Sequence, residues 1–148
     1  MQRARSVTLG WLVIASAACS DKAPEPWSAA EMSALSEQFS HIAEAYAVLD
    51  VCMPMIAADK DAKRSVISKI EVRRFSQLSQ MDTEAELANF FAYHRQRGGT
   101  EEQAVSLDRT YRESYQAATR QLTSIDGCAE TISDYANTIL QTKVRSVP

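Results

Sequence analysis

Residues 28–54 read SAAEMSALSEQFSHIAEAYAVLDVCMP and carry a sustained apolar pattern. Ser28 and Glu31 form a capping-box sequence, in which the two side chains satisfy free backbone amides at a helix start. Apolar residues then recur three or four positions apart, namely Met32, Leu35, Phe39, Ile42, Tyr46, Leu49 and Met53. This spacing predicts a long helix with a heptad seam, typical of helical bundles and coiled coils. Because Pro54 lacks a backbone amide, we expect the helix to end or kink there.

The rest of the chain also shows helical spacing, without the alternation typical of strands. We expect a second helix over about 56–80, although its apolar residues are less regular. Capping-box sequences at 83–86 and 100–103 predict two further helix starts, and Gly98-Gly99 predicts a helix end. Asp126-Gly127 either breaks the last helical stretch or lies inside one long helix. The sequence therefore predicts an all-α fold, a bundle of four or five helices.

Residues 1–18 have the layout of an export signal. Arg3 and Arg5 precede an apolar run of about twelve residues, well short of the roughly twenty that a membrane-spanning helix needs. Ala15-Ser16-Ala17 fits the small-x-small pattern of ordinary signal peptidase, which would release a soluble periplasmic protein.

A second processing site overlaps the first. Ser16-Ala17-Ala18-Cys19 resembles the lipobox of bacterial lipoproteins, with Ser16 where that pattern usually has Leu. The resemblance covers only the export segment. It implies that Cys19 becomes the acylated first residue, and that Ser20 directs the protein to the periplasmic face of the outer membrane. Several acyl chains would anchor the protein durably in that membrane.

The remaining chain divides into a tether and one domain. Residues 19–27 are polar, contain Pro24 and Pro26, and are expected to form a short tether at the membrane. Residues 28–148 are long enough for one domain with a sizeable core, which we expect to be the helical bundle.

The cysteine count supports export. An oxidising compartment allows Cys52 and Cys128 to pair, and acylation accounts for the third cysteine, Cys19. The predicted disulfide closes a loop of about 75 residues and ties the end of the first helix to the last part of the chain. Two buried free thiols are the alternative.

The charge distribution argues against nucleic acid as a partner. The formal net charge of −3 becomes about −5 once Arg3 and Arg5 are removed, whereas phosphate binding needs a basic surface. Between Ala23 and Asp59 there is no Lys or Arg, but cations then follow closely at Lys60, Lys63, Arg64, Lys69, Arg73 and Arg74. These segments form either two helices with complementary solvated faces, or a basic face for an acidic partner or anionic lipid.

The sequence contains no motif for nucleophilic catalysis, phosphate cradling, a zinc protease or covalent haem. We therefore predict no catalytic residues, no metal site and no cofactor. His41 and Glu44 lie one helical turn apart and could supply half of a metal site, but no second such pair follows, so a solvated polar face is favoured. His94 is expected to be structural and partly charged near a helix C-terminus.

One local feature indicates a contact patch. Phe90, Phe91 and Tyr93 lie too close together in sequence for all of them to face one core, and Arg95 and Arg97 follow. An exposed aromatic residue beside arginines is typical of protein interfaces.

These observations favour an exported, lipid-anchored, non-enzymatic helical interaction protein, a component or accessory of a bacterial envelope complex with a protein partner. A periplasmic inhibitor or immunity-type protein is the alternative hypothesis. A small enzyme, or a metal or ligand binder, is a third.

Overall fold

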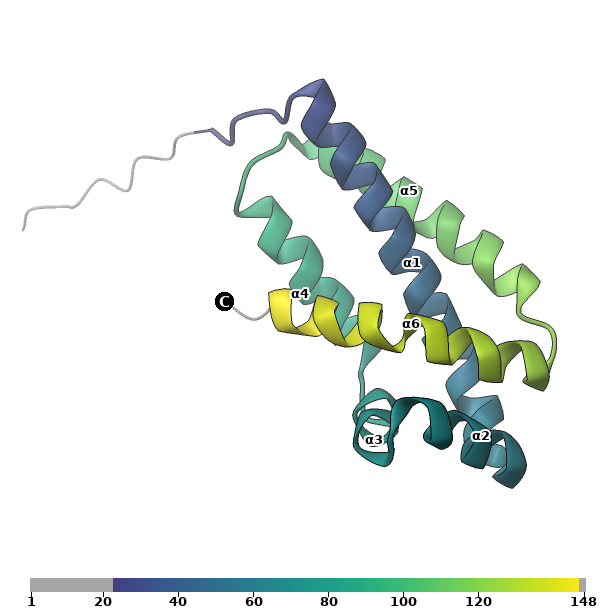
Figure 1. The fold of residues 1–148 in the computed structure, drawn as a ribbon. Coiled ribbons are helices and arrows are strands. Elements are labelled where there is room, and N and C mark those ends of the chain that lie inside the picture. The colour runs from purple at the N-terminus through teal and green to yellow at the C-terminus, as the bar shows by residue number, and fades with distance from the viewer. Residues whose placement is uncertain (1–22, 147–148) are drawn as a thin grey trace, which may run out of the picture.

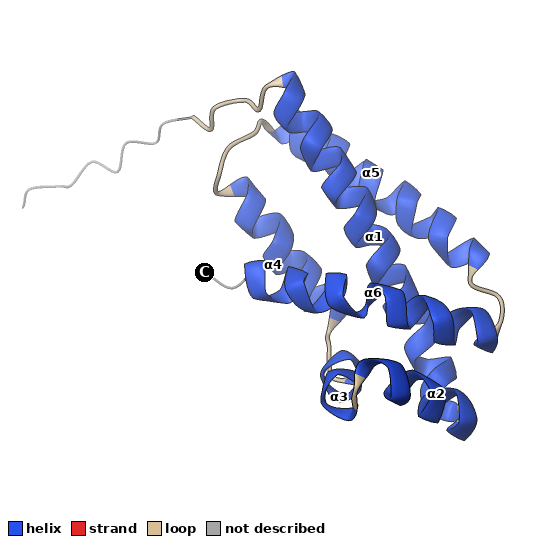
Figure 2. Ribbon diagram, viewed as in Figure 1, coloured by secondary structure: helices blue, strands red, loops and turns tan. Residues whose placement is uncertain are grey.

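The computed structural model describes residues 23–146, with side chains described as far as residue 141. This part of the chain forms six α-helices and contains no strand (Figure 2). The helices are α1 (Ala29–Ala58), α2 (Lys60–Ile70), α3 (Val72–Ser79), α4 (Thr83–Arg95), α5 (Glu101–Gln121) and α6 (Ile125–Ser146). The predicted all-α fold is confirmed, but the expected count of four or five helices is wrong. The predicted signal peptide, Cys19 and the first tether residues lie outside the described residues.

The long helix α1 forms the centre of the fold. Its capping box is confirmed, since the Glu31 amide donates to Ser28 Oγ (3.2 Å) and the Ser28 amide donates to Glu31 Oε2 (2.7 Å). In its middle the buried residues lie all round the helix, at Ile42, Ala43, Ala45, Tyr46, Ala47, Val48 and Leu49. A helix that is apolar on every side is covered by neighbours. The predicted heptad seam is therefore used inside the molecule from Phe39 onward.

Three helices surround α1, and their directions differ (Figure 1). Helix α5 runs beside α1 in the same direction, and a hydrogen bond between the Ser40 and Ser114 hydroxyls joins the two. Helix α4 returns the chain to the start of α1, while α6 crosses α1 at a steep angle. The two short helices α2 and α3 form one end of the molecule, where they pack beneath α1 and α6.

Pro54 does not end the first helix, so the first of the two predicted effects, an end or a kink, is wrong. It lies exposed inside α1, which continues to Ala58. Cys52, Met53 and Ile56 are buried on either side of it. Their packing in the core stabilises the helix through Pro54, although the proline amide cannot donate a hydrogen bond. The helix ends at Asp59, whose Oδ1 accepts from the amides of Asp61 and Ala62 and thereby caps α2.

The prediction of a single helix over 56–80 is also wrong. Two helices, α2 and α3, occupy most of this stretch, which accounts for the larger helix count. The chain breaks again at Glu71, whose φ of 72° is the one positive value at a non-glycine residue among the described residues. Residues other than glycine rarely adopt this backbone conformation. The break lets both short helices bury apolar residues in the core, namely Val66, Ile70, Phe75 and Leu78.

One of the two later capping boxes is confirmed, since Thr100 and Gln103 form the capping box of α5. The capping box predicted at 83–86 is wrong, because α4 begins at Thr83 and Asp82 caps it by accepting from the Ala85 amide. Gly127 lies in the first turn of α6 and the chain breaks just before it, where Ser124 Oγ accepts from the Gly127 amide (3.2 Å).

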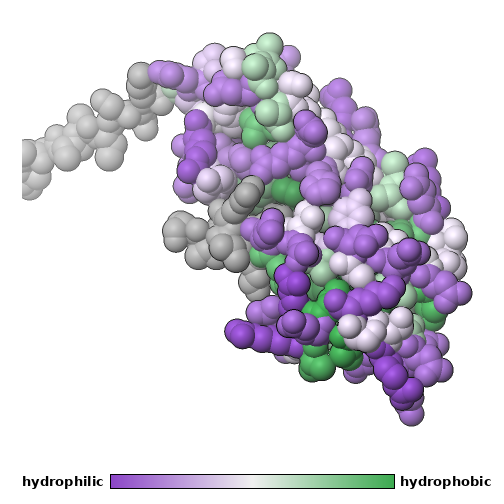
Figure 3. Space-filling model, viewed as in Figure 1, coloured by the Kyte–Doolittle hydropathy of each residue, from purple (hydrophilic) through white to green (hydrophobic). Residues whose placement is uncertain are grey.

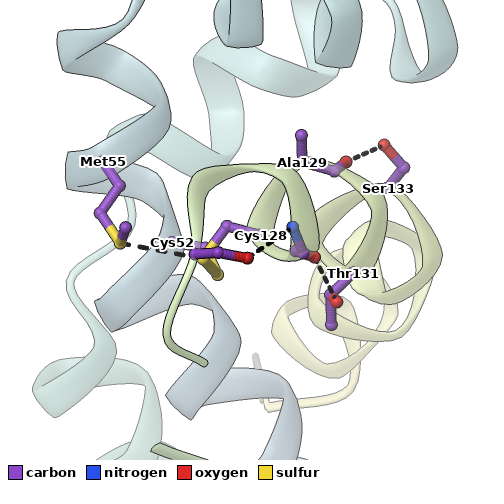
Figure 4. Close-up of a disulfide and its surroundings, with 8 residues drawn as sticks. Cys52, Met55, Cys128, Ala129, Thr131 and Ser133 are labelled. Carbon is purple, nitrogen blue, oxygen red and sulfur yellow. Dashed lines mark hydrogen bonds between the residues drawn. A yellow bond between two sulfur atoms is a disulfide. The ribbon is translucent and has the colours of Figure 1, made fainter. Parts of the chain in front are cut away.

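The predicted disulfide between Cys52 and Cys128 is confirmed, so the alternative of free thiols is wrong. The two Cα atoms lie 5.0 Å apart, 76 positions apart in sequence. Both cysteines are fully buried, and the Met55 sulfur lies 3.9 Å from the Cys128 sulfur (Figure 4). The bond fixes the C-terminal part of α1 to the first turn of α6.

The acidic and basic segments lie on separate helices, and among the described residues no ion pair joins α1 to α2 or α3. Arg64 pairs within α2 with Asp61 (3.8 Å), Lys63 lies over the Phe75 ring, and Arg74 donates to the Asn137 side chain. The cations of α2 and α3 instead face solvent at one end of the molecule.

The visible surface is mainly polar, with apolar side chains between the polar ones (Figure 3). Among the described residues only Val72 and Val105 are large hydrophobic residues that are exposed. By length and composition α1 could cross a membrane, but more than half of that apolar stretch is buried against other helices. The core helix of a folded domain passes the same test.

Candidate functional site: the cleft between α1, α4 and α6

A cleft of about 1000 Å³ opens between the N-terminal half of α1, α4 and the C-terminal part of α6. This volume lies at the upper end of typical ligand sites, about 300–1000 Å³. Its apolar wall is formed by Trp27, Leu35, Ile42, Phe90 and Tyr93. Ile42 and Phe90 belong to the core, so the floor of the cleft is continuous with the hydrophobic interior.

Trp27 is held at the cleft by the loop between α4 and α5. Its amide donates to Gln103 Oε1 (2.9 Å), and Gln103 Nε2 donates back to the Trp27 carbonyl (2.8 Å). The Gly99 amide donates to the carbonyl of Glu25 (2.8 Å). Gly99 has a φ of +86°, and a Cβ there would lie 2.4 Å from the Trp27 ring, so only glycine fits. The last residues of the predicted tether are thus docked on the domain.

His94 contributes a buried polar atom without a partner. Its Nε2 is inaccessible to solvent and has no hydrogen-bond partner. Its ring packs against those of Phe90 (4.5 Å between centroids), Tyr93 (5.1 Å) and Phe39 (5.5 Å). Burial, together with the nearby Arg97 charge, lowers the pKa of His94 below its usual 6.5. This environment disfavours the charged form of His94.

Arg97 lies next to His94 and stacks on Tyr93, with its guanidinium carbon 3.7 Å from the ring centroid. No carboxylate pairs with Arg97 among the described residues. Arg95, by contrast, binds both carboxylate oxygens of Glu101 (2.8 and 2.6 Å). The cleft therefore contains an uncompensated cation beside an unpartnered imidazole nitrogen.

Helix α4 divides the predicted contact patch between two faces. Phe90, Tyr93 and Arg97 line the cleft, although Phe90 is itself buried. Phe91 and Arg95 lie on the other side of α4, along a smaller depression shared with α5. The helical period of 3.6 residues explains this division, because positions 90, 93 and 97 share a face that 91 and 95 do not.

His41 and Glu44 each contact Tyr135. Glu44 Oε2 accepts a hydrogen bond from the Tyr135 hydroxyl (3.1 Å). The exposed His41 lies at the cleft with its ring 5.8 Å from that of Tyr135. Within the described part of the chain, no three His, Cys, Asp or Glu side chains are placed to hold a metal ion.

A second polar cluster lies on the other side of α1, where Asp50 accepts hydrogen bonds from Thr83 and Tyr115 (both 2.8 Å). The neighbouring Tyr46 hydroxyl is buried without a partner. Burial, with Glu86 and Asp50 nearby, raises the pKa of Tyr46 far above its usual value. These bonds join α1, α4 and α5, and their role is structural.

Comparison with known proteins finds no matching family model, no matching curated protein and no matching solved structure. The interpretation of the cleft therefore depends on its own geometry. Trp27 and His94 are the two site residues that the sequence reasoning missed. Their signals were weak: His94 falls four residues after Phe90 and three before Arg97, while Trp27 reaches the cleft only through the distant Gly99 and Gln103.

Proposed function

We propose that this protein is exported, is anchored by a lipid on Cys19 at the periplasmic face of the outer membrane, and binds an envelope partner without catalysing a reaction. The lipobox-like Ser16–Cys19 motif supports the anchor. The buried disulfide supports a destination in an oxidising compartment.

The cleft beside Trp27 is the observation that carries the binding role. It combines an apolar wall with a few polar groups, which is the usual composition of a binding site. It also starts where the chain leaves the tether. Residues 19–24 extend at most about 20 Å, so an anchor on Cys19 would keep a bound partner close to the membrane surface.

Site-specific photo-crosslinking in cells tests this function. A photoreactive amino acid replaces Gln38, which lines the cleft, and in a matched control replaces Gln116, which is exposed on α5. We expect one defined envelope protein to be captured from position 38 and not from position 116. Capture of nothing, or of the same proteins from both positions, would contradict a binding role for the cleft.

The anchor is tested separately by mass spectrometry of the mature N-terminus. We expect an acylated Cys19 as the first residue, and release of the Cys19→Ser variant from the membrane fraction. An unmodified N-terminus created by cleavage after Ala17 would contradict lipid anchoring.

A further inference from the structure

We infer that the cleft selects a segment of a partner polypeptide that presents a carboxylate beside an apolar side chain, with Arg97 forming the anion-binding end. This inference rests on the proposed function, because it names the chemistry of the partner that the cleft would bind.

The first argument is the unpaired charge of Arg97. Its guanidinium stacks face-on against Tyr93, which leaves the N–H groups at its edge available for a planar carboxylate. Arg95, two positions earlier, already holds Glu101 on the other face of α4. Arg95 is therefore already paired with a carboxylate, whereas Arg97 can pair with a carboxylate from a bound partner.

The second argument is that the acidic residue described at the cleft is already engaged. Glu31 is the one acidic residue among the described residues that line the cleft. Its carboxylate accepts from the Ser28 amide and from the Ser28 hydroxyl (both 2.7 Å), as part of the helix cap of α1. A partner that brings its own carboxylate therefore suits Arg97.

The remaining lining favours a polypeptide over a fatty acid. Leu35, Ile42 and Phe90 provide contacts for an apolar side chain next to the carboxylate. The side-chain amides of Gln38 and Gln141 also line the cleft and can pair with peptide N–H and C=O groups, which an alkyl chain lacks.

The test uses the chain purified after export and two capped tripeptides, leucyl-phenylalanyl-glutamate and its neutral glutamine isostere. Trp27 reports binding by fluorescence, because Trp11 leaves with the export segment. We expect the glutamate peptide to bind about tenfold or more tightly than the glutamine peptide.

Two matched variants identify the anion-binding residue. Arg97→Gln should abolish the preference for glutamate, whereas Arg95→Gln should keep it. The inference is overturned by equal binding of the two peptides, by equal loss in both variants, or by absence of binding. Binding of decanoate with no binding of either peptide would also overturn it, in favour of a fatty-acid site.

The failure of this inference can be distinguished from failure of the proposed function. Capture of an envelope protein from position 38, with no peptide preference, overturns only the carboxylate selection. Selective peptide binding with no captured protein overturns only the envelope partner.

Discussion

At the scale of single residues, Asp50 joins three helices through its two carboxylate oxygens. The Tyr115 hydroxyl of α5 and the Thr83 hydroxyl of α4 each donate to one of them. Burial and the hydrogen bond to Asp50 raise the pKa of Tyr115 to about 12. The folded-state pKa therefore exceeds the unfolded value of 10.0, so this stabilisation is present below pH 10 and is lost as the pH rises through 12.

We predict that Asp50→Ala lowers the pKa of Tyr115 toward 10 and reduces the free energy of unfolding by about 1 kcal/mol. Ultraviolet titration of the phenolate and urea unfolding measure the two effects. Asp108→Ala, which removes only an exposed ion pair with Arg112, is the control and should leave Tyr115 unchanged. An unaltered Tyr115 titration in Asp50→Ala would contradict the assignment.

The lowered pKa of His94 predicts a different pH dependence. Because the folded-state pKa lies below the unfolded 6.5, the protein loses stability as the pH falls through 6.5 toward the lowered value. We expect His94→Phe to remove this part of the acid sensitivity, seen by denaturant unfolding between about pH 7.5 and pH 5. His41→Phe, at an exposed position, should keep it. Parallel pH profiles for wild type and His94→Phe would refute the prediction.

At the scale of elements, the junction between α2 and α3 depends on Glu71. Its backbone has φ 72° and ψ 148°, which costs a non-glycine residue about 1–3 kcal/mol. The junction nevertheless forms, because it lets Ile70 and Phe75 on its two sides reach the core. Packing of the two helices therefore outweighs the local preference of the backbone.

We predict that Glu71→Gly stabilises the protein by about 1 kcal/mol, since glycine adopts this conformation without strain. Glu71→Ala removes the same carboxylate but keeps a Cβ, so it should leave the free energy of unfolding within about 0.5 kcal/mol of wild type. Chemical denaturation of both variants measures the difference. Equal effects of Gly and Ala would show that the charge, and not the backbone, matters at this position.

At the scale of the whole molecule, the disulfide connects parts of the chain that are far apart in sequence. Cys52 lies on α1 and Cys128 on α6, 76 positions apart in sequence. All of α2 to α5 lies within this loop. Closing so long a loop restricts the unfolded chain strongly.

We predict that replacing both cysteines by serine lowers the free energy of unfolding by about 4 kcal/mol, from the chain-entropy relation for a loop of this length. Guanidinium unfolding of the double variant, and of wild type with and without a reducing agent, provides the measurement. A loss below about 1 kcal/mol would mean that packing alone holds α6 on α1.

Local features of this fold could be predicted because neighbouring residues determine them. The capping boxes at Ser28 and Thr100 and the apolar stripe of α1 act over one or two helical turns, so the sequence places them correctly. The disulfide followed from cysteine arithmetic rather than geometry. The helix end expected at Pro54 and the single helix expected over 56–80 were wrong because core packing overrode local preferences.

By itself, then, the sequence determined an all-helical, disulfide-linked chain and the start of its central helix. Only the tertiary structure decided which residues form the cleft. Trp27, Leu35 and Arg97 come from three separate segments, and their meeting depends on α4 returning beside α1. The spacing of residues within one helix fixes their common face, but no local rule specifies which distant segment will cover that face. That choice results from packing, because the segments that bury the most apolar surface together are the ones that meet.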